Sequence, residues 1–547
     1  MRSYNTFTIL LVFAFLSLGF IGIVNHEMWL DELQAWLIAR DSSSVVDLFK
    51  NLRYEGHPGL WHIGLYLISR WTHNPFSMQV FHLIIATSSI YIFAKFSPFT
   101  KSQKVVFSFG YFPFYEYSII SRDYALGILL VFCFCALFST RTKSYLLLSS
   151  ILFLLANTNV YGLIIAITLG LTLIFDYILC GMRTLVHSSK WDLIISFFIF
   201  SLGIVSSLIQ IIPPPDASFA ANWTTSFQTE QLKIVLAAIA KSYIPIPKFF
   251  KYQFWNTSIF SFKQIGTDLG AIFSLGLLVF SLILFARKPA VFFLYVTGNL
   301  GMLLFMYFKY LGTMRHWGHL FVLFITCLWL TSYYTNTEQS IYSDNKNLFS
   351  TFYKKITQNG LVYRHKNKII MAILYTNLAA GIFAFTMDLY NPFSATKAVT
   401  NFVKDQKMEN ILIVGDVDYI NFIGPPLSTY LDRKVYYLGS HKSRFGSFIV
   451  WDKNRASATK QEVYMFFNEL NKPATVKEPD RLLVLNHKLE NCSSEKTGQS
   501  INKTQLKFED YCFEFKDLKF AEVAKFANSI IPDENPGFYL YFIQHKQ

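Results

Sequence analysis

Apolar segments of roughly membrane length recur through the first 390 residues, and this repetition constrains the fold more than any other feature of the sequence. A helix needs about 20 apolar residues to cross the roughly 30 Å hydrocarbon core of a bilayer. The composition agrees, because 52% of the residues are hydrophobic and only 15% are charged. Eleven spans are predicted, at about 6–24, 78–95, 105–119, 124–140, 144–157, 160–181, 191–212, 267–286, 290–307, 317–334 and 369–388.

The orientation of these spans follows from the basic loops. The first segment is expected to stay as an uncleaved span, because its apolar run is longer than a typical signal core and no small-residue cleavage site follows it. Short cytoplasmic loops carry an excess of Lys and Arg. Five basic loops fall on the same side as Arg2, namely 95–104, 141–143, 183–190, 287–288 and 346–368. We therefore expect a multi-pass protein of the plasma (inner) membrane with a cytoplasmic N-terminus, and everything after Leu389 on the outer side.

The net charge of +14 is accounted for mostly by this topology. No basic stripe with interleaved aromatic residues occurs in a soluble region, which is the pattern expected of a nucleic-acid-binding surface. Nucleic acid is therefore not an expected partner.

A second domain, 391–547, is predicted where the long apolar runs stop, after a membrane domain at 1–390. Strands are expected at 411–416, 434–438, 447–451, 481–485 and 537–542, and helices at 427–432 and 459–470. The pattern predicts an outward-facing α/β domain. Its first turn lacks the Gly-x-Gly-x-x-Gly series of a dinucleotide site, so an accessory or acceptor-recognising role is expected. Cys492 and Cys512 are a candidate disulfide in that oxidising compartment.

Two adjacent carboxylates, Asp31 and Glu32, directly follow the first predicted span and lie between Trp29 and Trp36. Ionisable groups at the edge of a bilayer are costly to place there, and tryptophan is typical of the interface. This arrangement indicates chemistry at a membrane face.

The predicted outer loop 25–77 is too long for a simple connector. Two amphipathic stretches, at 29–37 and 60–71, are expected to form helices on the membrane surface. Between them lie Glu55, Gly56, His57 and Pro58. This short stretch is also compatible with a re-entrant loop capped by polar residues.

Two further polar clusters lie at outer span ends. One runs from Glu116 to Tyr124 and includes Arg122 and Asp123, which could simply neutralise each other at a helix start. The other runs from Lys309 to Trp317 and includes Arg315 and His316. Its cations could extend to lipid headgroups or hold a phosphate, for which arginine offers a bidentate fork.

Together these features resemble the GT-C superfamily of polyprenyl-phosphate-sugar glycosyltransferases. The shared layout is an acidic pair after the first span, a long first outer loop, a second acidic motif before the fourth span and an outer α/β domain. The Glu-x-x-x-x-x-Arg-Asp-Tyr element at 116–124 and the Gly-His-Pro element at 56–58 are similar to those of its protein O-mannosyltransferase-like and aminoarabinose-transferase-like branch. The resemblance covers residues 1–390 in layout and a few short motifs in sequence. It implies a polytopic α-helical GT-C-like fold.

The resemblance also implies roles for individual residues and a reaction. Asp31 would be the general base with Glu32 supporting it, and the acceptor would attack with inversion and expel polyprenyl phosphate. Glu116 and Asp123 would complete the catalytic carboxylates. The residues expected to bind substrate or phosphate are His57, Glu55, Arg122, Tyr124, Lys309, Arg315 and His316.

A divalent cation, Mg or Mn, is an optional cofactor in this interpretation. Its candidate ligands are Asp31, Glu116, Asp123 and His57. The expected partners are membrane lipid, the polyprenyl-phosphate sugar and a glycan, lipid or protein acceptor. Two other classes stay open, a polytopic transporter or lipid flippase and a noncatalytic protein that presents its outer domain. The transporter class is disfavoured because no pair of Gly/Pro-broken spans recurs in matching halves.

Overall fold

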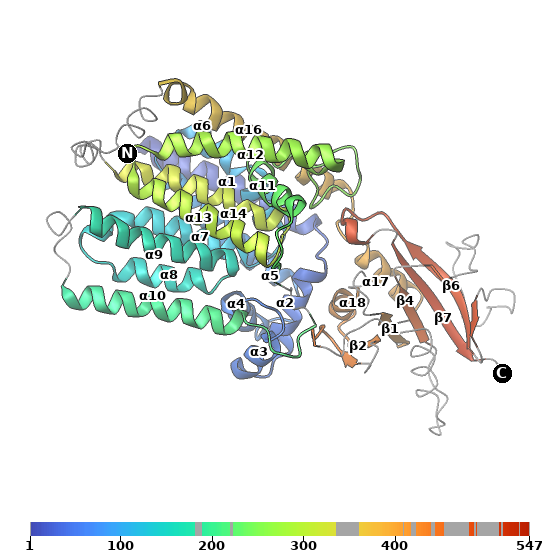
Figure 1. The fold of residues 1–547 in the computed structure, drawn as a ribbon. Helices are drawn as coiled ribbons and strands as arrows, with labels where there is room; N and C mark the ends of the chain where they lie inside the picture. The colour runs from blue at the N-terminus through green and yellow to red at the C-terminus, as the bar shows by residue number, and fades with distance from the viewer. Residues whose placement is uncertain are drawn as a thin grey trace.

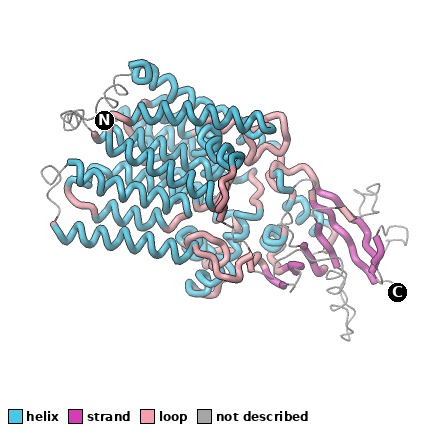
Figure 2. Tube along the Cα trace, in the orientation of Figure 1, coloured by secondary structure: helices cyan, strands magenta, loops and turns pink. Residues whose placement is uncertain are grey.

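The computed structural model consists of a helical bundle that ends at Tyr390 and a sheet domain that follows it (Figures 1 and 2). It describes residues 2–180, 189–218, 223–334, 360–408, 410–416, 423–438, 444–452, 481–485, 488–489, 513–515, 518–534 and 537–545. The predicted helix 459–470 and the candidate disulfide between Cys492 and Cys512 lie outside these residues.

Eight helices among the described residues are long and apolar enough to cross a membrane, which is compatible with a multi-pass membrane protein. They coincide with eight of the predicted spans. They are α1 (Arg2–Asn25), α5 (Phe76–Phe96), α7 (Tyr124–Leu137, extended by a 3₁₀ turn to Thr142), α9 (Val160–Cys180), α10 (Lys190–Ile211), α12 (Lys263–Phe285), α13 (Pro289–Phe308) and α16 (Gly360–Tyr390).

The other three predicted spans form shorter helices. Segment 105–119 is divided at Gly110 into α6 (Lys101–Ser108) and the π-helix η1 (Tyr111–Ile119). The other two spans correspond to the 11-residue helix α8 (Leu146–Ala156) and the 17-residue helix α14 (Met314–Leu330). At about 1.5 Å per residue, α8 is roughly half as long as the hydrocarbon core is thick. Helix length therefore supports eight of the eleven spans.

The loop 25–77 contains three helices, α2 (Leu30–Asp41), α3 (Val45–Leu52) and α4 (Leu60–Ser69). The expectation that its first helix lies on a membrane surface is wrong. Helix α2 packs against α4 on one side and against α18 of the sheet domain on another, so most of its residues are buried. On the polar face of α2, Gln34 and Asp41 hydrogen-bond to Ile449 and Ser447 of the sheet domain, a docking that local periodicity does not predict.

The connection from Pro213 to Gly266 holds a helix that the sequence analysis missed, α11 (Thr229–Tyr243). It packs against α12 and α14 within the bundle, and Val235, Ala238 and Ile239 are fully or almost fully buried. Figure 1 shows α11 beside α12. Its 15 residues are too few to be recognised as a span.

Among the described residues of the C-terminal domain, seven strands form one sheet in the order β3-β2-β1-β4-β7-β6-β5. The strands are β1 (Leu412–Asp416), β2 (Val435–Leu438), β3 (Arg444–Gly446), β4 (Arg481–Leu485), β5 (Phe513–Phe515), β6 (Leu518–Phe526) and β7 (Phe538–His545). Strand β1 pairs in parallel with β2 and β4, and the remaining pairs are antiparallel. The sheet confirms four of the five predicted strands. The expected strand 447–451 is wrong, because these residues follow β3 and leave the sheet.

Two helices of the described chain stand between the sheet and the bundle, α17 (Thr396–Asp405) and α18 (Gly424–Tyr430). Figure 1 shows both on the side of the sheet that faces α2, with the N-terminus of the chain at the far end of the bundle. The Tyr430 hydroxyl donates to the Met28 carbonyl at 3.3 Å, which joins α18 to the segment before α2. The sheet domain is thus packed onto the end of the bundle that carries loop 25–77.

Candidate functional site

A cavity of about 380 Å³ lies where loop 25–77, the bundle and the sheet domain meet. Five helices of the described chain begin at its wall: α2, α4, α7, α9 and α14. Unsatisfied N–H groups give a helix N-terminus a partial positive charge, which favours anions. The fold therefore concentrates positive backbone potential at one cavity.

Turn chemistry places two segments of the cavity wall. Gly56 has φ +66° and Gly312 has φ +72°, a region that glycine enters without steric cost. Gly56 turns the chain so that His57 reaches the cavity before α4 begins. Gly312 precedes the Thr313 cap of α14 and brings Arg315 to the first turn of that helix.

Asp31 bridges two arginines that are far apart in the sequence. Its Oδ2 lies 3.0 Å from Arg122 Nη1 and 3.0 Å from Arg315 Nη2. The Asp31 side chain is 24% exposed, and both guanidinium groups are more buried. Arg315 also lies over the rings of Trp29 and Trp255, at 5.5 Å from each centroid. This packing holds the planar cation in a partly dry site.

Asp123 lines the same cavity but has no hydrogen-bond partner for either carboxylate oxygen among the described residues. It is 5% exposed. Arg122 is its neighbour in the chain, yet that side chain pairs with Asp31. The charges of Arg122 and Asp123 still attract each other, but the structure shows no direct ion pair between the two side chains among the described residues. A buried carboxylate without a partner is costly, and such groups are frequent at functional sites.

Glu32 is turned away from the cavity, contrary to its expected supporting role beside Asp31. Its Oε1 accepts from the Ser121 backbone N–H at 2.7 Å, and its Oε2 accepts from the Trp29 N–H at 3.2 Å. The fully buried Glu32 thus holds the start of α2 against the segment that carries Arg122. It is a positioning residue in this geometry.

His26 completes the buried network around Glu32. Its Nε2 lies 3.1 Å from Glu32 Oε2, and its Nδ1 lies 2.8 Å from Asp388 Oδ2. Burial by itself lowers the pKa of His26, but the carboxylates of Asp388 and Glu32 outweigh it and raise the pKa to about 10. A cationic His26 therefore joins the ends of α1 and α16 to α2.

Glu116 also lies outside the cavity lining. Its Oε2 accepts from the Tyr111 hydroxyl at 2.9 Å and from Trp255 Nε1 at 3.2 Å. Trp255 belongs to the connection after α11, and its ring stands edge-on to Trp29. Glu116 therefore fixes an indole that packs on Arg315, and it does not face a substrate.

Two cavity residues come from the segment before α4. Glu55 Oε1 accepts from Gln34 Nε2 at 2.9 Å. His57 is enclosed, burial lowers its pKa, and its Nδ1 has no partner among the described residues. A neutral His57 can donate or accept one hydrogen bond within the cavity. Lys309 lines the cavity from the end of α13, and its ammonium lies 5.0 Å from the Trp223 ring centroid.

His316 and Tyr124 position each other in the cavity wall. The Thr313 N–H donates to His316 Nδ1 at 2.9 Å, so Nε2 carries the proton and donates to the Tyr124 hydroxyl at 3.1 Å. Both His316 nitrogens are engaged within the protein. The Tyr124 hydroxyl keeps its own proton for a ligand.

The candidate metal ligands do not assemble. Asp31 holds two arginines, Glu116 faces Trp255, and only Asp123 and His57 keep unpartnered atoms in the cavity. The part of the chain that the structure describes contains no group of three or more His, Cys, Asp or Glu that could hold a metal ion. A divalent cation stays a prediction.

The sequence analysis missed residues from three places. Asn159 and Tyr161 come from the start of α9, Trp451 follows β3, and Asp533 belongs to the 3₁₀ turn η8 (Pro532–Glu534). The polar Asn157-Thr158-Asn159 run between two apolar segments is a signal that could have indicated the first pair. No local signal marks Trp451 or Asp533.

Segment 447–452 is clamped against the bundle, and this explains how Trp451 reaches the cavity. Ile449 donates its N–H to Gln34 Oε1 at 2.9 Å and accepts from Gln34 Nε2 at 2.8 Å. The Ser218 N–H donates to the Trp451 carbonyl at 2.9 Å. The expected strand is thus replaced by hydrogen bonds to α2 and to the segment after α10.

Comparison of the chain with protein-family models, with curated proteins and with solved structures finds no match. Two guanidinium groups, five helix N-termini and one unpartnered carboxylate can bind an anion and accept a proton beside it.

Proposed function

We propose that the protein is a membrane glycosyltransferase that moves a sugar from a polyprenyl-phosphate donor to a lipid, polysaccharide or protein acceptor at the outer membrane face. One observation carries the proposal: Arg122 and Arg315 converge on Asp31 next to a buried, unpartnered Asp123. The layout that resembles GT-C enzymes and the eight apolar helices agree with a lipid-linked donor.

The arginine pair is suited to the donor phosphate. Asp31 occupies one N–H of each guanidinium, as an oxygen of a bound phosphate would. Asp31 thereby keeps two like charges together before the donor binds. The donor phosphate would then accept hydrogen bonds from these N–H groups in place of Asp31. The same N–H groups would stabilise the negative charge that develops on the leaving phosphate in a partly dry site.

The acceptor proton is assigned to Asp123 in this proposal, where the sequence pointed to Asp31. A protonated Asp31 would lose its charge-assisted contacts with both arginines, whereas Asp123 gives up no partner among the described residues. The acceptor oxygen attacks the anomeric carbon, and the bond from that carbon to the phosphate oxygen breaks. The electron pair leaves with polyprenyl phosphate, and the acceptor proton passes to Asp123, so the product has the inverted configuration.

The sheet domain would serve the acceptor side. Trp451 and Asp533 line the cavity from this domain, and an indole ring and a carboxylate are side chains that suit a hydroxylated ring. An accessory domain that supplies part of the cavity wall is consistent with acceptor recognition.

The test compares glycolipids, polysaccharides and glycoproteins by mass spectrometry in producing cells that carry wild-type protein, Asp123→Asn or Asp268→Asn at matched expression. Asp268 is a matched control, because its exposed carboxylate pairs with Lys233 away from the cavity. Loss of one sugar increment in Asp123→Asn alone supports the transferase and identifies sugar and acceptor. Unchanged glycans in all three cells would reject it and favour transport.

A further inference from the structure

The first turn of α9 places two buried polar groups in the cavity wall that the reaction described above does not use. Asn159 is 1% exposed and Tyr161 is 3% exposed. Neither Asn159 Nδ2 nor the Tyr161 hydroxyl has a hydrogen-bond partner within the described part of the chain. Buried polar groups are usually paired, so two unpaired ones in the wall of one cavity point to a ligand.

Both side chains are fixed in place. Asn159 caps α9, because its Oδ1 accepts from the Gly162 N–H at 2.8 Å, and this leaves the amide nitrogen as the free end. The Tyr161 ring stacks on His319 with centroids 5.0 Å apart and meets Phe305 edge-on. The two polar groups therefore await a ligand without needing to reorganise.

A third group of the same kind comes from α4. His62 is 5% exposed and lines the cavity, and its Nδ1 lacks a partner among the described residues. Burial lowers the pKa of His62 to about 3, so the ring is neutral and offers one donor and one acceptor. Asn159, Tyr161 and His62 thus supply hydrogen bonds without a net charge.

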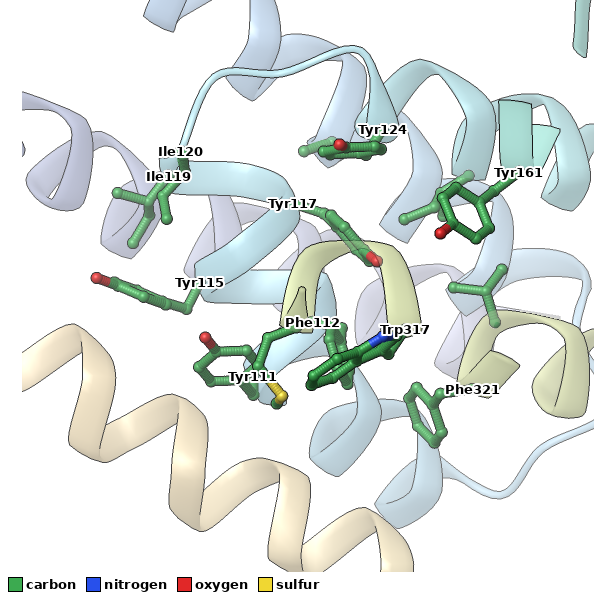
Figure 3. Packing of buried hydrophobic residues seen from close by; sticks show 14 of the residues in the cluster. Tyr111, Phe112, Tyr115, Tyr117, Ile119, Ile120, Tyr124, Tyr161, Trp317 and Phe321 are labelled. Atoms are coloured by element: carbon green, nitrogen blue, oxygen red, sulfur yellow. The ribbon is translucent and has the colours of Figure 1, made fainter. Parts of the chain in front are cut away.

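This neutral set adjoins the charged end of the cavity. The Tyr161 ring lies 5.5 Å from the His316 ring, and His316 directly follows Arg315 in the first turn of α14. Figure 3 shows Tyr161 in the same aromatic cluster as Tyr117 and Tyr124. The Tyr117 hydroxyl donates to the Arg315 carbonyl at 2.5 Å, which ties the cluster to the arginine.

We infer that Asn159, Tyr161 and His62 form a neutral subsite that binds hydroxyl groups of the sugar carried by the donor. The inference rests on the proposed function and adds to it the residues that select the sugar. A group linked to a phosphate on Arg122 and Arg315 would extend beside His316 toward α9. Neutral hydrogen-bond donors and acceptors match hydroxyl groups, which both donate and accept hydrogen bonds. They would stabilise a second phosphate less than a cationic side chain would.

The test measures binding to the purified full-length protein in detergent. The probes are farnesyl phosphate, farnesyl diphosphate and farnesyl phosphate linked to mannose, glucose, galactose or arabinose. The variants are Tyr161→Phe, which removes only the unpaired hydroxyl, and Asn159→Asp, which keeps the helix cap but loses the amide donor. Tyr243→Phe is the matched control, because its buried hydroxyl lies 3.1 Å from the Tyr295 hydroxyl outside the cavity lining.

We expect at least one farnesyl phosphate sugar to bind more tightly than farnesyl phosphate to the wild type. Tyr161→Phe should weaken that sugar by about 3- to 10-fold, the value of one neutral hydrogen bond, and leave farnesyl phosphate unchanged. Asn159→Asp should also weaken the sugar and, because it adds a negative charge beside the phosphate, should weaken farnesyl phosphate as well, whereas Tyr243→Phe should change neither probe.

Three results would overturn the subsite. The first is that no sugar binds more tightly than farnesyl phosphate, and the second is that Tyr161→Phe weakens the binding of all probes equally. The third is that Tyr161→Phe weakens the binding of farnesyl diphosphate and not of the sugars, which would indicate a second phosphate site. Failure of farnesyl phosphate itself to bind the wild type would instead reject the proposed function, and with it the subsite.

Discussion

Replacing Asp123 by Asn should change catalysis without lowering stability. The two side chains have nearly the same shape, and the Asp123 carboxylate accepts no hydrogen bond from the described residues. Loss of a general base typically lowers a rate by about 100- to 10,000-fold. We therefore expect transfer to fall within that range.

The same substitution should not destabilise the protein. A carboxylate that is 5% exposed and unpartnered carries a desolvation cost that a neutral amide largely avoids. The free energy of unfolding is expected to stay constant or to rise by up to about 2 kcal/mol. Such a gain in stability with a loss of activity is typical of a residue retained for function.

Asp31→Asn is the variant with which the stability of Asp123→Asn should be compared. It removes a carboxylate 3.0 Å from two guanidinium groups and leaves Arg122 and Arg315 facing each other without it. We expect the free energy of unfolding to fall by about 1 to 3 kcal/mol.

The assay pairs thermal unfolding in detergent with the transfer rate from a farnesyl phosphate sugar for wild type, Asp123→Asn and Asp31→Asn. Two results would refute the reasoning: Asp123→Asn transfers sugar at the wild-type rate, or it loses as much stability as Asp31→Asn. The first would remove the base assignment, and the second would show that the carboxylate is paired.

Three further predictions concern Arg315, Glu32 and His26. Arg315→Lys keeps the charge but loses the planar fork, so the Kd for farnesyl phosphate should rise about 10-fold or more, whereas Lys309→Arg should change it little. Glu32→Gln should lower the free energy of unfolding by about 1 to 3 kcal/mol, because it leaves a buried cationic His26 with one carboxylate fewer, and equal stability would contradict the positioning role. His26 has a pKa of about 10 in the folded protein against 6.5 unfolded, so its contribution to stability is complete below pH 6.5 and is lost as the pH rises to 10; unfolding measured over that range should show this loss, and His26→Gln should flatten it.

Much of the helical bundle could be predicted from local sequence. An apolar run of about 20 residues can satisfy its backbone in a bilayer only as a helix or a closed barrel, so eight spans were visible without tertiary information. Helices α8 and α14 were recognised, but with 11 and 17 residues they are shorter than the spans predicted for them. Helix α11 escaped because a 15-residue helix inside the bundle has no membrane-length signature.

The candidate site was likewise only partly predictable from the sequence. The sequence by itself determined that acids and cations gather at the ends of apolar segments, because charged groups are costly to place in hydrocarbon. Such residues are easily recognised next to long apolar runs. The sequence therefore contained Asp31, Asp123, Arg122 and Arg315 as candidates. Adjacent residues in a helix point in different directions, however, and sequence alone could not decide which of Asp31 and Glu32 faces the cavity.

Only the tertiary structure decided the partners. Arg122 pairs with Asp31 and not with its neighbour Asp123, Glu32 turns to Ser121 and His26, and the sheet domain brings Trp451 and Asp533 to the cavity. Apart from the contact of Glu32 with His26, which lie six positions apart, each of these outcomes depends on distances between segments that are tens to hundreds of residues apart. A side chain's charge is a property of its residue type, but its partner and its exposure are properties of the packed chain, because hydrogen bonds and ion pairs act over only a few ångströms.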